Sequence, residues 1–525
     1  MAARVHPFDA CGTSRPAESR SLSQNLEIDV REAFAFDSLF HCIQETRMKF
    51  RIAPLVIIAL AAFLAASGAV FAQMDAATHQ LAHDIFKQLI EINTTDSVGN
   101  VSTAAEAMAQ RLLDAGFPAA DVQVLGPNAR KKNMVARLHG TGAHKPILFI
   151  GHLDVVEAPR ADWATDPFQF VEKDGYYYGR GTEDMKSEDA VLVTNFIRLK
   201  KEGYKPDRDL ILALTADEEG GKSNGVDWLL KNHRDLIDAE FVINADGGGV
   251  DLQNGKPVMV SMDATEKLYG DYQLEVTDPG GHSSVPRADN AIYELAGGLM
   301  RLAKYKFPFE LNPVTRAYFQ RMAQAETGQT AADMNAVTRT PPDAEAIARL
   351  SADPHLNSTM RTTCVATRLQ AGLANNALPQ VAQAIVNCRI LPGHSREEVR
   401  KDLVRVVDDP KIAVRYMDTD LVIHDTAPDA VALPPVPLRP DVMKPLEETA
   451  QEFWPGAPVI PTMATGASDG VYTNAAGMPT YEICGTAIEI GEDRSHARDE
   501  RVPVKSFYDD VDFFYHFIKA LAPQN

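Results

Sequence analysis

The chain has 525 residues, more than one ordinary domain contains, so we expect two domains. Its hydrophobic content of 45% and its charged content of 24% are typical of a globular protein. The formal net charge of −20 argues against nucleic acid and anionic membrane surfaces as partners, because both are negatively charged themselves.

The N-terminal region has the features of a processed leader. Residues 1–47 show no clear period and look like an over-extended reading frame, with Met48 as the true start. A basic start then precedes an apolar run at 52–70, and Ala72 ends a Val-x-Ala sequence that is typical of signal-peptide cleavage. We therefore predict a signal peptide at 48–72 and a secreted, periplasmic protein. An uncleaved membrane anchor is the alternative, because the apolar run is near the lower limit for a spanning helix.

Three cysteines remain after this cleavage, Cys364, Cys388 and Cys484. The number is odd, so at most one disulfide can form within a monomer. No two of them are close in sequence, and nothing suggests a cysteine-based metal site.

Helical and strand patterns alternate between residues 79 and 271. The stretch 77–115 carries two apolar stripes at helical spacing, and residues 133–138 and 146–150 have the pattern of strands. This alternation predicts an α/β domain with a mixed, mostly parallel sheet flanked by helices.

Histidine or acidic residues follow several of these apolar runs. They are His152 and Asp154 after 146–150, Asp184 in a glycine-bounded turn, Glu218 and Glu219 after 210–214, and Asp246 after 241–245. Any one of them alone is better explained as a solvated turn. Open α/β sheets place their sites at the carboxyl ends of the strands, so we expect these side chains to converge on one edge.

Histidine and carboxylate ligands without thiolates suit Zn²⁺, with Mn²⁺ or Co²⁺ as alternatives. These residues are more than one ion needs, whereas two ions about 3.5–4 Å apart that share a carboxylate would use them all. Such a pair polarises a carbonyl and activates a water, and a carboxylate that binds no metal must then move the proton. The adjacent Glu218 and Glu219 can divide these roles, one as base and one as ligand.

From about residue 269 the pattern changes to the alternation of antiparallel strands. Strand patterns lie at 272–276, 363–369 and 383–390, and a helix pattern lies at 288–302. We predict an inserted α+β lid or dimerisation domain at 271–393, between two parts of a catalytic domain at 73–270 and 394–525. The segment 306–362 is partly helical and has no predicted role.

The chain resembles the M20 family of co-catalytic zinc metallopeptidases, which includes glutamate carboxypeptidases, aminoacylases and acetylornithine deacetylases. The matching segments follow the family order over about residues 80–520. They are GHLD at 151–154, GRGTEDMK at 179–186, DEEG at 217–220, NAD at 244–246, GGHSS at 280–284, NALP at 376–379 with Arg389, and HARDERV at 496–502. Together these segments are far more specific than any one of them alone.

The resemblance implies a role for each matching residue. Asp184 would bridge two Zn²⁺ ions per subunit, with His152 and Asp246 completing one site and Glu219 and His496 the other. Glu218 would be the general base. Asp154 would hold His152, and the peptide bond between Asp184 and Met185 would be cis.

The resemblance also implies residues that contact the substrate. His282 would reach the active site of a dimer partner and stabilise the oxyanion. Asn376 and Arg389 would hold the substrate, with Arg389 binding a carboxylate bidentately. Gly466 and Ser468 belong to a loop that would line the pocket. One departure is Glu188, which stands where many members have glycine and would either change the pocket edge or cap a helix.

The implied function is that of a secreted di-zinc metallohydrolase that cleaves an amide bond next to a free carboxylate in small peptides, as carboxypeptidases and dipeptidases do. An N-acyl amino acid deacylase on the same site is the alternative, since its substrates present the same two groups. A relative that only binds a ligand is a further hypothesis, and the presence of Glu218 and all five ligands argues against it. A one-metal aminopeptidase would not need the lid arginine. We expect no nucleic acid partner, no membrane contact after cleavage, and a possible homodimer through the lid.

Overall fold

The computed structural model describes residues 76–428 and 434–524. The predicted extension at 1–47 and the predicted signal peptide at 48–72 lie outside these residues. Among the helices that the structure describes, none is both long enough and apolar enough to cross a membrane.

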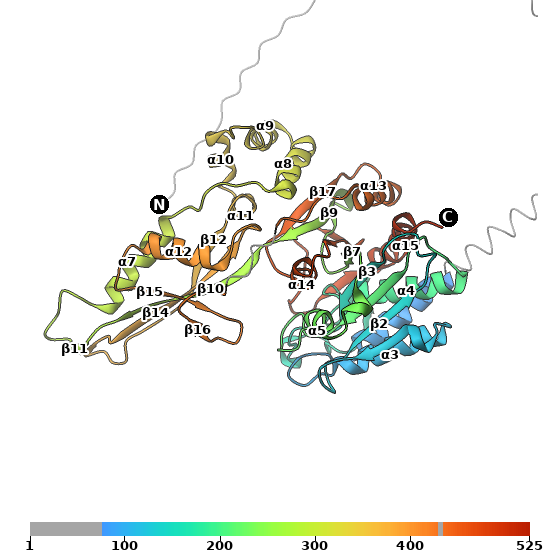
Figure 1. The fold of residues 1–525 in the computed structure, drawn as a ribbon, viewed down its shortest axis with the longest axis horizontal. Helices are drawn as coiled ribbons and strands as arrows, with labels where there is room; N and C mark the ends of the chain where they lie inside the picture. The colour runs from blue at the N-terminus through green and yellow to red at the C-terminus, as the bar shows by residue number, and fades with distance from the viewer. Residues whose placement is uncertain (1–75, 429–433, 525) are drawn as a thin grey trace, which may run out of the picture. The chain divides into compact units, whose positions relative to one another are not determined.

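The larger lobe is built on a ten-stranded mixed sheet (Figure 1). Its strands are β1 (Val122–Leu125), β2 (Asn133–Leu138), β6 (Leu210–Thr215), β3 (Ile147–His152), β7 (Phe241–Asn244), β18 (Thr480–Glu482), β9 (Lys256–Glu266), β8 (Gly249–Gln253) and β19 (Ala487–Glu489), with β17 (Val459–Ala464) paired to β9. The central strands β6, β3, β7 and β18 are parallel neighbours. β1 pairs with β2 in antiparallel orientation, and so does β8 with β9. The predicted α/β class with a mostly parallel sheet is confirmed.

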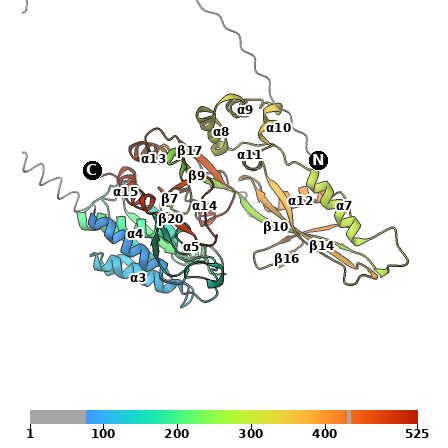
Figure 2. The same ribbon diagram turned by 180° about the vertical axis from the view of Figure 1, so that it is seen from behind.

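Helices cover both faces of this sheet, which explains the continuous apolar runs of its central strands. Along β3, Ile147 and Phe149 pack into one core and Leu148 and Ile150 into another. The first core contains residues of α3 (Val101–Asp114), α4 (Lys186–Glu202), α13 (Pro440–Phe453) and α15 (Val504–Leu521), and the second contains residues of α5 (Gly225–Asn232) and α6 (Arg234–Ile237) (Figure 2). The burial of both faces leaves the strand ends as the place where polar side chains gather.

The smaller lobe is an antiparallel sheet with its own core. The strand order is β12 (Thr363–Ala371), β14 (Val381–Ile390), β10 (Leu268–Thr277), β15 (Ala413–Met417) and β16 (Ile423–His424). The helices α7 (Ala291–Lys304) and α12 (Arg396–Val407) contribute to that core. Cys364 and Cys388 lie opposite each other on β12 and β14 and form a disulfide, while Cys484 is free and buried.

The predicted end of the inserted domain at residue 393 is wrong. β15 pairs with β10, and Val399 and Leu403 of α12 pack in the core of the smaller lobe, so this lobe continues beyond residue 393. The helical period of the apolar residues at 396–407 indicates a helix with one buried face, as observed for α12. It does not indicate which of two sheets that face covers, because helical period carries no information about the partner.

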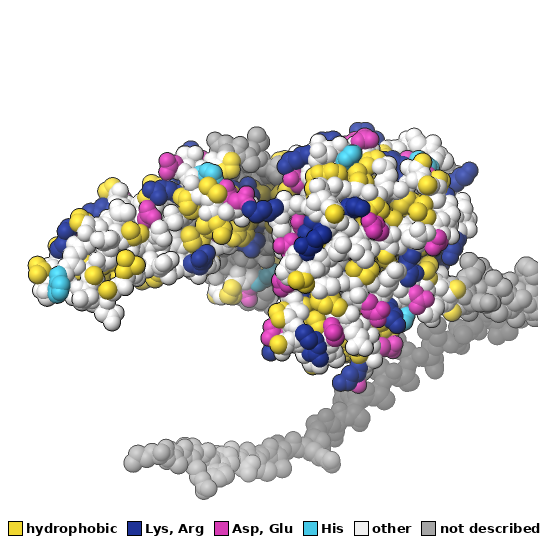
Figure 3. Space-filling model, turned by 90° about the horizontal axis from the view of Figure 1, so that it is seen from below, with side chains coloured by type: hydrophobic (Ala, Val, Ile, Leu, Met, Phe, Trp, Pro, Cys, Tyr) yellow, Lys and Arg dark blue, Asp and Glu magenta, His cyan; other side chains and the backbone are white. Residues whose placement is uncertain are grey.

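Four helices occupy most of the segment 306–362. They are α8 (Pro313–Ala325), α9 (Gly328–Val337), α10 (Ala344–Leu350) and α11 (Pro354–Thr359). Their apolar residues form a separate core with Ile460 of β17, so this segment packs on the larger sheet. On the face shown in Figure 3, basic and acidic side chains are interspersed, so the net negative charge does not form one patch there.

Candidate metal centre

The carboxyl ends of β6, β3 and β7 meet at one edge of the sheet, because these strands are parallel neighbours. His152 is the last residue of β3, Glu218 and Glu219 follow β6, and Asp246 follows β7. Asp184 lies in the turn before α4, and the peptide bond that follows it is cis, as predicted.

The first group of metal-ligating side chains consists of His152, Asp184 and Asp246. His152 Nε2 lies 3.0 Å from Asp184 Oδ1 and 3.3 Å from Asp246 Oδ1. The ring is buried, and its Nδ1 lies 3.0 Å from the backbone carbonyl oxygen of Asp154. That contact orients the ring so that Nε2 faces the two carboxylates.

The second group consists of Asp184, Glu219 and His496. His496 Nε2 lies 2.9 Å from Asp184 Oδ2 and 2.8 Å from Glu219 Oε2. Asp184 therefore offers one oxygen to each group, as a bridging carboxylate must.

The donor set fits two divalent ions of the zinc type. It contains one imidazole nitrogen per group, carboxylate oxygens and no thiolate, and the ligand atoms within each group lie within 4.8 Å of one another. Hydrogen bonds to Asp184 and Glu219 raise the pKa of His496 to about 10, because both carboxylates favour the charged imidazolium. The five residues would hold the ions if these are bound.

Glu218 lies beside both groups but belongs to neither. It lines a pocket of about 260 Å³ together with Asp184, Glu219, Asp246 and His496. Within the described chain its carboxylate makes no hydrogen bond or ion pair, and burial raises its pKa to about 10.

The neighbouring Asp217 is held apart from these residues. Its backbone has a φ of 60°, and its carboxylate pairs with the buried ammonium of Lys131 and accepts the N–H of Ser223 at 3.1 Å. The three consecutive carboxylates thus have three different surroundings, which limits their mutual repulsion. Sequence reasoning did not find Lys131, because no local pattern links positions 131 and 217.

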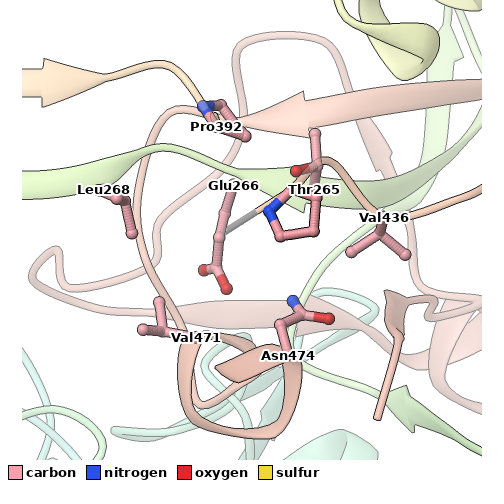
Figure 4. A pocket seen from close by; sticks show the side chains of 8 residues that line it. Thr265, Glu266, Leu268, Pro392, Val436, Val471 and Asn474 are labelled. Carbon is pink, nitrogen blue, oxygen red and sulfur yellow. The ribbon is translucent and has the colours of Figure 1, made fainter. Parts of the chain in front are cut away.

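The loop that contains Gly466 and Ser468 lines the same pocket. The Ser468 N–H donates to Glu266 at 2.6 Å, and its hydroxyl donates to Glu482 at 2.5 Å. Figure 4 shows that Glu266 also points into an adjoining pocket, whose apolar wall includes Leu268 and Val471. Two carboxylates therefore fix the position of this loop.

The model of peptidase family M20/M25/M40 matches residues 148–520, which is more than half of the chain. The chain belongs to this family. It is an M20 metallohydrolase of the carboxypeptidase, dipeptidase or N-acyl amino acid hydrolase type, and it acts on C–N bonds.

Two relatives are similar over most of this M20 chain. The probable carboxypeptidase S-like 2 of Dictyostelium discoideum is 29% identical over 394 residues, 71% of each chain. The human N-fatty-acyl-amino acid synthase/hydrolase PM20D1 is 27% identical over 388 residues, 71% of this chain and 74% of its own. An M20 family metallo-carboxypeptidase from Sulfolobus solfataricus shares the fold, with a TM-score of 0.62 and 17% identity over 84% of this chain and 99% of its own.

The structure does not bring the predicted lid residues to the metal centre within one chain. His282 and Asn376 lie at a two-stranded ribbon formed by β11 (Gly281–His282) and β13 (Ala377–Leu378), where the Ser283 N–H donates to the Asn376 carbonyl at 3.0 Å. His282 is exposed. The guanidinium carbon of Arg389 lies 4.9 Å from the ring centroid of Tyr269, which lines a larger cleft beside Glu218.

Glu188 does not lie at the pocket edge. It is 2% exposed, and its carboxylate accepts the hydroxyl hydrogen of Thr486 at 2.7 Å. Burial beside Asp510 raises its pKa well above the usual range. The expectation that it changes the pocket edge is therefore wrong. It lies in the first turn of α4, at the helix start that the alternative named.

Asp154 contacts His152, as predicted, but through its backbone carbonyl and not through its carboxylate. The carboxylate of Asp154 is 3.8 Å from His152 Nδ1 and instead accepts the N–H of Glu218 at 3.1 Å and of Glu219 at 3.0 Å. Asp154 therefore positions His152 through its backbone and the two glutamates through its side chain.

Asp154→Asn should lower kcat by about 10- to 100-fold, a loss typical of residues that orient metal ligands. The amide keeps one acceptor oxygen but turns its NH₂ group toward one of the two N–H donors. Steady-state kinetics at saturating Zn²⁺ measure the effect. An unchanged kcat would show that the carboxylate does not position Glu218.

Proposed function

We propose that this chain is a di-zinc hydrolase that cleaves the amide bond next to a free carboxylate in small peptides. The observation that supports this most strongly is the shared Asp184, with one oxygen in each metal-ligating group, beside the unliganded Glu218. His152 and Asp246 would hold one ion, and Glu219 and His496 the other. Bound ions would supply Lewis acidity toward the carbonyl and lower the pKa of a water.

Glu218 would take a proton from the attacking water and deliver it to the leaving nitrogen. Burial raises the pKa of its carboxyl group, and divalent ions held by the neighbouring residues would oppose that shift and favour the carboxylate. The neutral acid that forms after proton uptake is favoured by the same burial. The surroundings of Glu218 therefore suit both halves of a proton transfer.

The substrate carboxylate would bind Arg389, as the family resemblance implies. An N-acyl amino acid hydrolase is the second candidate, favoured by the similarity to PM20D1, whose name describes hydrolysis of N-fatty-acyl amino acids. Both substrates present an amide beside a carboxylate, so the metal centre itself does not separate them.

A substrate panel at defined Zn²⁺ tests this proposal. It contains N-blocked dipeptides, C-blocked dipeptides and N-acyl amino acids with short and long acyl chains. Cleavage of N-blocked but not C-blocked dipeptides is expected, and preference for long acyl chains would favour the second candidate. Cleavage of C-blocked dipeptides would favour an aminopeptidase, and binding of Zn²⁺ without any cleavage would favour a ligand-binding protein.

We also propose a homodimer through the smaller lobe. β12 is an edge strand of that sheet, and its Val365 and Leu369 are 61% and 69% exposed. Such an edge can pair with a second copy. The partner's lobe would then supply the oxyanion contact of His282, which makes no contact with the metal centre of its own chain.

His282→Ala should lower kcat by about 10²–10³-fold if the histidine stabilises the oxyanion. His394→Ala is the matched control, because His394 lies in the same lobe and its Nε2 contacts Glu310. Unchanged kinetics for the first variant would remove His282 from the mechanism. Sedimentation of the wild-type chain as a monomer at assay concentration would contradict the dimer.

Export to the periplasm is a further proposal, and the disulfide between Cys364 and Cys388 supports it, because disulfides persist in oxidising compartments. N-terminal sequencing of the exported protein should begin at Gln73. Peptides from residues upstream of Met48 would reject the assigned start, and retention in the membrane would favour the anchor.

A further inference from the structure

Glu500 is a fully buried carboxylate that the proposed mechanism does not use. It follows His496 by four positions and directly precedes β20 (Arg501–Pro503). Its Oε1 accepts the backbone N–H of Glu183 at 2.7 Å and of Asp184 at 3.1 Å. Its Oε2 accepts the N–H of Gly181 at 3.2 Å and pairs with the guanidinium of Arg180. Four donors from one turn thus converge on one side chain.

The two segments that Glu500 joins each carry a metal-ligating residue, although they are more than 300 positions apart in the sequence. One donor is the backbone N–H of Asp184, the carboxylate shared by both groups. On the other side, Arg180 Nη2 donates to the backbone carbonyl of His496 at 3.3 Å. The pairing of β20 with β5 (Tyr176–Tyr178) holds the same two segments together.

The backbone around His496 depends on this anchoring. His496 has a φ of 63° and Asp499 a φ of 52°, both in the left-handed region that side chains other than glycine adopt rarely. Such conformations persist only where the surrounding structure fixes them. Glu500 is completely buried directly beside them, so it limits how far the His496 loop can relax.

We propose that Glu500 is a positioning residue that fixes Asp184 and His496 relative to each other. The two oxygens of Asp184 then face the two metal-ligating groups separately. An ion pair with Arg180 alone would compensate its buried charge. Three of its four hydrogen-bond donors are instead the backbone N–H groups of the Asp184 turn. The proposal rests on the proposed two-metal centre and adds a residue that binds neither metal nor substrate.

Glu500→Gln tests this role with little change in volume. The amide has one acceptor oxygen, so its NH₂ group must face either Arg180 or the backbone N–H groups. We expect Zn²⁺ affinity to fall by about 10- to 100-fold, the usual range for residues that orient metal ligands. The visible absorption of the Co²⁺-loaded protein should change because it reports ligand geometry. At saturating metal, kcat should fall by a similar factor while KM changes little.

Asp333→Asn is the matched control. Asp333 is 3% exposed, and its carboxylate pairs with the Arg349 guanidinium at 2.7 and 2.8 Å within the helical segment 306–362. Both substitutions replace a buried carboxylate by an amide, but no metal-ligating residue contacts Asp333. Zn²⁺ affinity and the Co²⁺ spectrum should match those of the wild type even if the melting temperature falls.

Glu500→Gln with wild-type Zn²⁺ affinity and an unchanged Co²⁺ spectrum would overturn the proposal, whatever its melting temperature. If this variant does not fold, Arg180→Lys replaces it as the test. Lysine keeps the charge but removes the planar donor to the His496 carbonyl. An unchanged Zn²⁺ affinity and Co²⁺ spectrum of Arg180→Lys would overturn the proposal equally. A wild-type chain that binds fewer than two Zn²⁺ ions would instead contradict the proposed two-metal centre, so the two failures are distinguishable.

Discussion

Glu218→Ala should abolish measurable turnover and leave two metal ions bound. Glu218 lies in the pocket of the metal-ligating residues but belongs to neither group, so its removal takes away the proton carrier and no ligand. General acid–base catalysis contributes about 10²–10⁴-fold, and we expect a loss at the upper end because one residue serves both proton transfers. The measurements are kcat and the metal content of the purified protein.

Glu218→Gln is the matched variant, since it keeps the shape of the side chain and removes its ability to take a proton. It should lose as much activity as the alanine variant. Turnover within about tenfold of the wild type would exclude Glu218 as the main proton carrier, since it falls below the usual contribution of this catalysis. Loss of one bound ion would instead show that Glu218 is a ligand.

Asp184→Ala should lose metal from both groups at once. Its Oδ1 faces His152 and its Oδ2 faces His496, so one substitution removes a ligand from each ion and the negative charge between them. Activity should fall with the metal content, and added Zn²⁺ at moderate concentration should not restore it. Mass spectrometry of metal content after dialysis measures the effect.

Single-group variants are the controls for this result. Asp246→Ala should weaken only the group of His152, and Glu219→Ala only the group of His496, because each residue belongs to one group. Two tightly bound ions in Asp184→Ala would show that the shared carboxylate is dispensable. Equal losses in all three variants would show that the two groups do not bind metal separately.

The helices and strands could be predicted where the spacing of apolar residues along the sequence indicates them. The apolar run 210–214 is continuous because β6 is buried on both faces, and its length and composition favour a strand. The assignment of α12 failed for a different reason. Its stripe predicts a helix, but the choice between two hydrophobic cores depends on contacts such as those of Val399 and Leu403, which no local pattern encodes.

In the candidate site, too, some features could be predicted from the sequence and others could not. Histidine and carboxylates at the ends of parallel strands predict convergence, because parallel strands end at one edge. The partners that hold them were not predictable, since Lys131 meets Asp217 across 86 positions and Glu500 meets Asp184 across 316. Glu500 stands in the segment that matches the family, yet a residue type at a position does not reveal which backbone N–H groups it accepts.

The most direct test of the account is a crystal structure of the Zn²⁺-loaded protein with anomalous data at the zinc edge. We expect two anomalous peaks on either side of Asp184, one ligated by His152 and Asp246 and the other by Glu219 and His496. Glu218 should bind neither ion. A single peak, a peak ligated by Glu218, or peaks away from these side chains would contradict the two-metal centre.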